Sequence, residues 1–182
     1  MGSSRLTYRE AGIRETKKVI DLCETWWYDS AWYKNTGMKF ESTQDYWYGM
    51  FQLGVMIATV GEDENGDVKA AYVGCKQPYM FNHSYMTASE VVWCIDKDYR
   101  TGQNLVNLLN SVEELMKKHE VNIYNLNIPV DDSKDKLANS LVKRGFFKQD
   151  LSLFKEINNG YDTNIDKRRN SNRYSNRFNR NT

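Results

Sequence analysis

The chain has 182 residues, 40% of them hydrophobic, which is enough for one domain with a buried core. Its formal net charge of +1 excludes a protein that is strongly basic or acidic overall, and no run approaches the roughly 20 apolar residues of a membrane span. The N-terminus carries no apolar signal region, so we expect a cytoplasmic protein.

The first part of the chain predicts one strand and two helices. Residues 5–10 alternate in polarity, which indicates a strand, and Gly12 ends it. Apolar side chains recur at helical spacing over residues 13–28. A second helix is expected from Ser42, which opens a partial capping box, to Gly54. Aromatic residues crowd the segment 26–48.

Three strands are predicted next. Residues 55–60 and 68–75 flank an Asn65–Gly66 turn and should form a hairpin. The single glycine of the second strand, Gly74, indicates a bulge. We expect a loop or an extended excursion over residues 77–85 and a further strand over residues 86–95.

The last part of the chain alternates helices and strands. A helix is expected over residues 103–120, a strand over 121–128 and a capped helix after Asp131–Ser133 that Gly145 ends. A final strand is predicted over residues 151–157. This order predicts a single α/β (α+β) domain with a mixed, mostly antiparallel sheet flanked by helices.

The predicted domain covers residues 1–157, and an Asn/Arg-rich tail that we expect to be disordered covers 158–182. From Lys167 onward there are six basic residues and no acidic ones. Tyr174 and Phe178 lie among them, a pattern typical of weak nucleic-acid binding by residues 167–182. A solubilising or protein-docking extension would have the same composition.

The three cysteines are scattered and form no C-x-x-C pair, and the two histidines are far apart in sequence. A metal site is therefore not expected, and the odd number of cysteines suits a reducing compartment.

Residues 89–109 combine a buried strand, a charged turn with one glycine, and the start of a helix. Amides at a helix start have no partner within the helix, and the helix dipole favours an anion there. The segment therefore predicts a phosphate socket, and the acidic residue Glu90 lies on the strand that leads to it.

Three motifs in this order resemble the GCN5-related N-acetyltransferases (GNAT). Residues 90–95 resemble the fourth strand of the family, residues 98–104 its pyrophosphate loop, and residues 141–146 its closing motif. The loop is one residue shorter than in the family, and Asn104 replaces its second glycine; asparagine tolerates left-handed angles better than most residues. Leu141 stands where the family often has a tyrosine that protonates the departing thiolate.

The resemblance implies acetyl-CoA as cofactor and Glu90 as the catalytic base. It places the thioester beside the backbone amides of four strand residues, Val92, Trp93, Cys94 and Ile95. It places the pyrophosphate on the turn and helix start, formed by Arg100, Thr101, Gly102, Gln103, Asn104 and Leu105. One asparagine of the next strand, Asn127, would contact the pantetheine arm. Glu90 could instead pair with a lysine or face water, and Asn127 could simply cover a polar face of the sheet.

In the family, the first two helices border the acceptor site, so the aromatic segment could select an apolar or cationic acceptor; it could equally form core or an interface. The sequence thus predicts acetyl transfer from acetyl-CoA to a small-molecule or protein amine. The alternative is a degenerate GNAT-like binding or structural protein, similar to proteins that tailed phages encode, with a place in the virion. The acceptor and the oligomeric state stay open.

Overall fold

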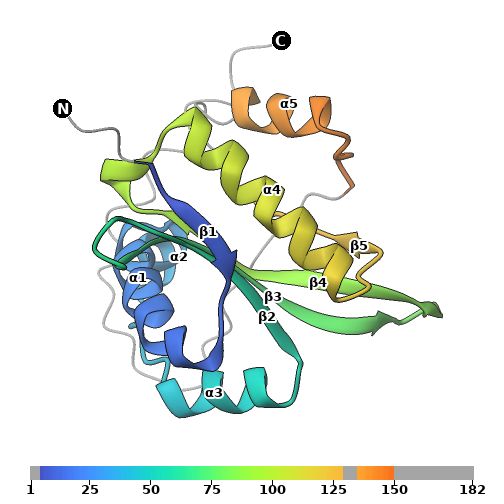
Figure 1. The fold of residues 1–182 in the computed structure, drawn as a ribbon, viewed down its shortest axis with the longest axis horizontal. Coiled ribbons are helices and arrows are strands. Elements are labelled where there is room, and N and C mark those ends of the chain that lie inside the picture. Colours follow the sequence, from blue (N-terminus) through green and yellow to red (C-terminus); the bar gives the residue numbers. More distant parts are fainter. Residues whose placement is uncertain (1–4, 129–134, 150–182) are drawn as a thin grey trace, which may run out of the picture.

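The computed structural model describes residues 5–128 and 135–149. In this part of the chain, five strands form one sheet in the order β1-β2-β3-β4-β5 (Figure 1). The strands are β1 (Thr7–Glu10), β2 (Met56–Glu62), β3 (Val68–Tyr79), β4 (Asn82–Ile95) and β5 (Ile123–Tyr124). The α-helices are α1 (Thr16–Asp29), α2 (Ala31–Thr36), α3 (Gln44–Gln52), α4 (Gly102–Lys118) and α5 (Asp135–Lys143).

The first four strands pair antiparallel, and β4 pairs parallel with β5 because α4 crosses over between them. This confirms the predicted fold class. The parallel ladder is short: Thr87 pairs with Ile123 and Ala88 with Tyr124.

The sheet separates two apolar cores. On one face, α1 and α3 pack through residues such as Val19, Cys23 and Trp47 against β2, β3 and β4. On the other face, Leu108 and Val112 of α4 lie over the sheet, together with other residues of the same stripe (Figure 1). Side chains alternate across a strand, so β4 contributes to both cores.

Side-chain caps fix where several helices begin. Thr43 accepts a hydrogen bond from an amide in the first turn of α3, and Thr101 does so for α4. Ser30 caps the six-residue α2, which lies in the aromatic segment and was not predicted. No described helix has the length and apolar character that a membrane crossing requires.

Of the two alternatives for residues 77–85, the structure shows the extended excursion and not the loop, because β3 continues to Tyr79 and β4 begins at Asn82. One sequence prediction was wrong in extent. The expected strand over residues 121–128 pairs only at Ile123 and Tyr124, because β5 then diverges from β4. The cap at Asp131–Ser133, the strand over 151–157 and the tail over 158–182 lie outside the described residues.

Candidate active site

A bulge in β4 lies opposite Gly74, as the sequence predicted. Val73 pairs with Val92 and Gly74 pairs with Glu90, which leaves Val91 as the extra residue. Glycine is required at position 74 because a Cβ atom there would lie 2.7 Å from the hydroxyl oxygen of Tyr72. The bulge therefore places Glu90 beside the ring of a fully buried tyrosine.

Beyond the short parallel ladder, side chains span the gap between β4 and the segment after β5. The amide of Glu90 donates to Asn125 Oδ1 at 3.0 Å, and the amide of Asn127 donates to the Glu90 carboxylate. Trp93 Nε1 donates to the carbonyl oxygen of Asn127 at 3.0 Å. The strands thus diverge as in a cofactor cleft, but Glu90 and Trp93 bridge the opening.

Burial raises the pKa of Glu90 to about 7, and the hydrogen bonds from Asn127 oppose this shift. Its pKa shows no influence from a cation among the described residues, so the lysine pairing considered from the sequence is not found. The negative charge of Glu90 also helps to raise the pKa of Tyr72, after burial, which places the two side chains in one electrostatic environment. A carboxyl group with a pKa near 7 suits proton transfer at neutral pH.

Two of the four predicted amides of β4 face the gap. Asp96 N donates to Lys69 O on β3, and backbone groups alternate along a strand, so the amides of Val92 and Cys94 also point toward β3. Those of Trp93 and Ile95 point the other way. The Ile95 carbonyl confirms this direction because it accepts a hydrogen bond from the Arg100 side chain outside the ladder, at 2.8 Å.

The turn before α4 satisfies most of its own amides. The amide of Thr101 donates to Tyr99 O at 2.8 Å, and that of Leu105 to Thr101 O at 3.0 Å. The amide of Asn104 donates to the Thr101 hydroxyl at 3.1 Å. Within the described residues, this leaves the amides of Gly102 and Gln103 without a protein acceptor. The candidate phosphate socket therefore has two open amides at the first turn of α4.

Asn104 has a structural position in this turn. It is 2% exposed, its Nδ2 donates to Tyr99 O at 2.9 Å, and its carbonyl accepts from the Tyr8 hydroxyl at 2.8 Å. The left-handed conformation considered for Asn104 is wrong, because the residue lies inside α4, and Glu120 is the one non-glycine residue with positive φ in the described chain. The Arg100 side chain folds back on β4 through its bond to Ile95.

Leu141, which occupies the position of the family's thiolate acid, is buried on α5. Arg144 ties α5 to α4 through Glu113 and Asn110, both at 2.8 Å. One tyrosine that the sequence did not single out, Tyr72, lies near Glu90 instead, and its ring meets that of Tyr124 edge to face at 6.3 Å. The Tyr72 hydroxyl is buried and has no hydrogen-bond partner in the described structure. In the sequence, Tyr72 lies two residues before Gly74, the glycine that pairs with Glu90. This spacing is the signal from which its position near Glu90 could have been predicted.

The aromatic segment 26–48 is divided between core and surface. Trp47 is buried, and Trp26 and Phe40 pack against the core beneath α1. Tyr28 and Trp32 are 41% and 38% exposed, so part of the segment is open to an acceptor or a partner. No group of three or more candidate metal ligands occurs in the part of the chain that the structure describes.

No family model and no curated protein matches this sequence. The fold does match solved structures. An aminoglycoside acetyltransferase from an uncultured soil metagenomic sample aligns with a TM-score of 0.65 at 12% identity, over 84% of this chain and 97% of its own. Glucosamine-6-phosphate N-acetyltransferase from Arabidopsis thaliana aligns with a TM-score of 0.61 at 12% identity, over 83% and 97%. Ribosomal-protein-alanine N-acetyltransferase from Brucella melitensis biovar Abortus 2308 aligns with a TM-score of 0.57 at 11% identity, over 84% and 98%.

The chain has the GNAT fold. At these identities the likeness extends to the arrangement of strands and helices. Within the GNAT fold, the bulge at Val91 and the diverging β4 and β5 are the local features that shape the region around Glu90.

Proposed function

We propose that this protein transfers an acetyl group from acetyl-CoA to an amine. The observation that carries the proposal is the partly buried Glu90 carboxyl group, with a pKa of about 7, at the point where β4 and β5 diverge. The three GNAT-fold proteins compared above, which are acetyltransferases by name, support the same reaction class.

The residues around the gap fit the cofactor. Acetyl-CoA would supply an acetyl group activated as a thioester. The open amides of Gly102 and Gln103 would donate hydrogen bonds to its diphosphate at the positive end of α4. The amides of Trp93 and Ile95 would donate to the thioester oxygen, as in an oxyanion hole. The Asn127 side chain stands at the same gap as a candidate contact for the pantetheine arm.

Glu90 would accept the proton from the acceptor ammonium group. A free carboxylate is needed for this step, so the base form of Glu90 accumulates as the pH rises through about 7. The Asn127 amide donates to the Glu90 carboxylate and holds it in place. This hydrogen bond lowers the pKa of Glu90 and so offsets part of the rise that burial causes.

A second candidate function is a GNAT-fold binding protein without turnover. The bridging contacts of Glu90 and Trp93 with Asn127 favour it, because they occupy the opening that a cofactor arm would use. Leu141 favours it as well, because an alkyl side chain cannot protonate a thiolate. In this function the basic tail could contribute nucleic-acid binding, and truncation after Ile157 would then abolish binding and its steep salt dependence.

Calorimetry with acetyl-CoA, followed by an acetylation assay, separates the two functions. The amine panel would include an aminoglycoside, an amino-sugar phosphate and a peptide with N-terminal alanine. We expect binding and turnover with at least one amine. Absence of binding at near-millimolar acetyl-CoA would exclude the enzyme, and binding without turnover on a broad panel would support the second candidate.

The role of Glu90 is tested by the variant Glu90→Gln. The matched control is Glu114→Gln, which removes an exposed carboxylate on α4. Loss of a general base lowers turnover by about 10²–10⁴-fold, whereas cofactor affinity should hold. Wild-type turnover should rise through about pH 7 and the residual turnover of Glu90→Gln should not. Equal turnover in the two proteins would remove Glu90 as the base.

A further inference from the structure

The hairpin of β3 and β4 extends beyond the rest of the described chain (Figure 1). Every residue from 77 to 85 is exposed, so neither face of this part of the hairpin packs on a core. The sheet proper, where β2 and β5 flank it, ends before this segment. Residues 77–85 therefore form an arm, which we call the hairpin arm.

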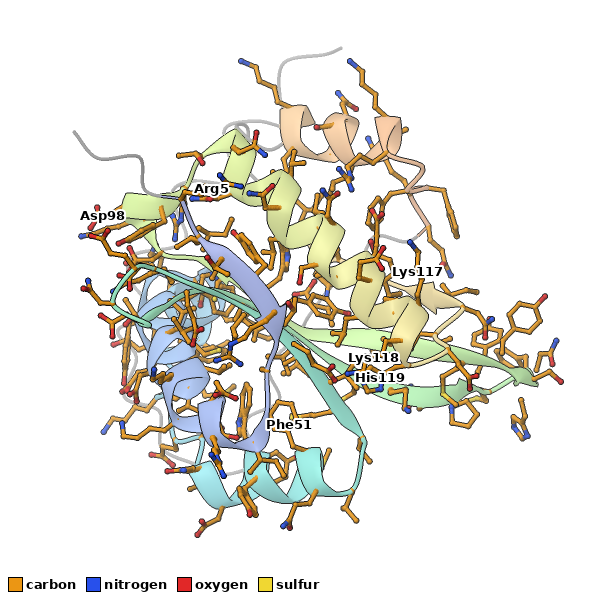
Figure 2. All side chains as sticks on the ribbon, in the orientation of Figure 1. Arg5, Phe51, Asp98, Lys117, Lys118 and His119 are labelled. Atoms are coloured by element: carbon orange, nitrogen blue, oxygen red, sulfur yellow. The ribbon has the colours of Figure 1, made fainter. Side chains whose placement is uncertain are left out.

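The hairpin arm presents large apolar side chains to solvent. Phe81 is 84% exposed and Met80 77%, and Tyr79 and Tyr85 are 41% and 47% exposed. The rings of Tyr79 and Phe81 meet edge to face at 5.8 Å, so the tip has an ordered aromatic surface. Side chains project freely around this arm in Figure 2. An exposed cluster of this kind marks an interaction surface.

Charge is missing from the arm and from its base. Residues 77–89 contain no Lys, Arg, Asp or Glu, although 27% of the chain is charged. Natural proteins usually place charge on exposed strands to prevent association. Here no like charges would oppose each other if two identical arms met.

Asparagine side chains occupy backbone amides on the arm and at its base. The Met86 amide, on the edge of β4 away from β3, donates to Asn122 Oδ1 at 2.7 Å. The Ser84 amide, in the irregular stretch between the Pro78–Met86 and Tyr79–Asn82 pairs, donates to Asn82 Oδ1 at 3.1 Å. Association through added strand pairing is thus hindered, and packing of side chains is the mode that the arm offers.

We propose that the hairpin arm is a dimerisation surface on which the arm of a second copy packs about a two-fold axis. The four apolar side chains expose about 500 Å² together, on the scale of 150–250 Å² for a whole aromatic side chain. Complete burial of this area in both copies would cover at most about 1,000 Å², which reaches the lower bound for a specific interface. A second copy offers the same uncharged patch by definition, as a two-fold interface requires.

The same features count against a membrane as the occupant. Segments that bind at a membrane surface combine apolar side chains with Lys or Arg near the headgroups, and residues 77–89 contain neither Lys nor Arg. Because the arm extends from the body, two copies can meet at their arms without bringing their charged bodies together.

Sedimentation velocity of the full chain over a wide concentration range tests the proposal. We expect a monomer–dimer equilibrium in the micromolar range. Phe81→Lys should weaken it at least tenfold, because it places a charge in the centre of the patch. The matched control is Leu53→Lys, at the end of α3, where the side chain is 76% exposed but far from the arm in sequence; it should dimerise as the wild type does.

Oxidative cross-linking provides a second readout that does not depend on affinity. His83→Cys places a thiol on the arm and should give a covalent dimer, which Phe81→Lys in the same chain should suppress. Asn65→Cys, at the exposed turn between β2 and β3, is the control and should give none.

Three outcomes would overturn the proposal. The wild type could remain monomeric at all concentrations, or Phe81→Lys could leave the dimer unchanged. The wild type could also stay monomeric and sediment with phosphatidylcholine vesicles, which would make the arm a membrane contact.

Discussion

Replacement of Glu90 by glutamine should stabilise the protein in a pH-dependent way. Burial raises the pKa of Glu90 from 4.5 to about 7, so the folded state binds a proton more tightly than the unfolded chain. Its favourable contribution is therefore complete below pH 4.5 and is lost as the pH rises through 7. The glutamine side chain is neutral at every pH, so the stability of Glu90→Gln does not fall as the pH rises through 7.

The magnitude follows from the rise of the Glu90 pKa from 4.5 to about 7. A difference of one in pKa corresponds to about 1.36 kcal/mol. Between pH 4.5 and pH 8, the free energy of unfolding of Glu90→Gln should therefore increase by about 3 kcal/mol relative to that of the wild type. A glutamine carbonyl can still accept from the Asn127 amide, so that contact is preserved in the variant.

Urea unfolding of both proteins at pH 4.5 and pH 8 measures this difference, and the two slopes against urea show whether both unfold alike. Other titrating groups cancel because they are common to both chains. Glu114→Gln removes an exposed carboxylate and should change stability by less than about 1 kcal/mol at either pH. Parallel pH profiles for wild type and Glu90→Gln would refute the assignment of a partly buried, proton-binding Glu90.

Three further predictions concern packing. Gly74→Ala should destabilise the fold by about 1–3 kcal/mol because its Cβ meets the Tyr72 hydroxyl oxygen at 2.7 Å, and Tyr72→Phe should recover part of this cost in a double-mutant cycle; additive costs would contradict the contact. Asn104→Ala should cost about 0.5–1.5 kcal/mol in urea unfolding, because the carbonyl of Tyr99 loses the Asn104 donor but keeps that of the Thr101 amide. A thiol reagent should react with the half-buried Cys75 in the native protein and with the two buried cysteines only on unfolding; fast reaction of all three would show that the core is open.

The sequence predicted those parts of the fold that have one buried face. The stripe of Leu108, Val112 and their neighbours gave α4 at nearly its observed limits, and the crossover implied the parallel β4–β5 pair. The sequence left a loop and an extended excursion open for the hairpin arm, because a segment exposed on both faces has no period-two pattern that would indicate paired strands. The divergence of β5 after Tyr124 was not predicted either. Residues 125–128 keep the alternating pattern of a strand, although they do not pair with β4.

Prediction of the site was limited by geometry that only the folded chain shows. A glycine and an arginine in the turn indicated a phosphate socket, but whether an amide is open depends on the cap. Thr101 satisfies the amide of Asn104, so the open pair falls at Gly102 and Gln103. The alternation of residues 92–95 gave the strand, whereas the bulge at Val91 decides which of their amides face the gap.

Stability and the proposed activity depend on the same substructure around Gly74. The missing side chain lets the Tyr72 ring lie along β3, the bulge turns Glu90 toward Asn127, and the resulting burial raises the pKa of the carboxyl group. The pH at which Glu90 becomes a competent base is therefore also the pH at which its charge destabilises the fold. If the site is catalytic, Glu90→Gln should be more stable and less active at pH 8. If the protein only binds, the variant should gain the same stability and lose no function, and a binding protein would have no reason to keep so unfavourable a partly buried acid.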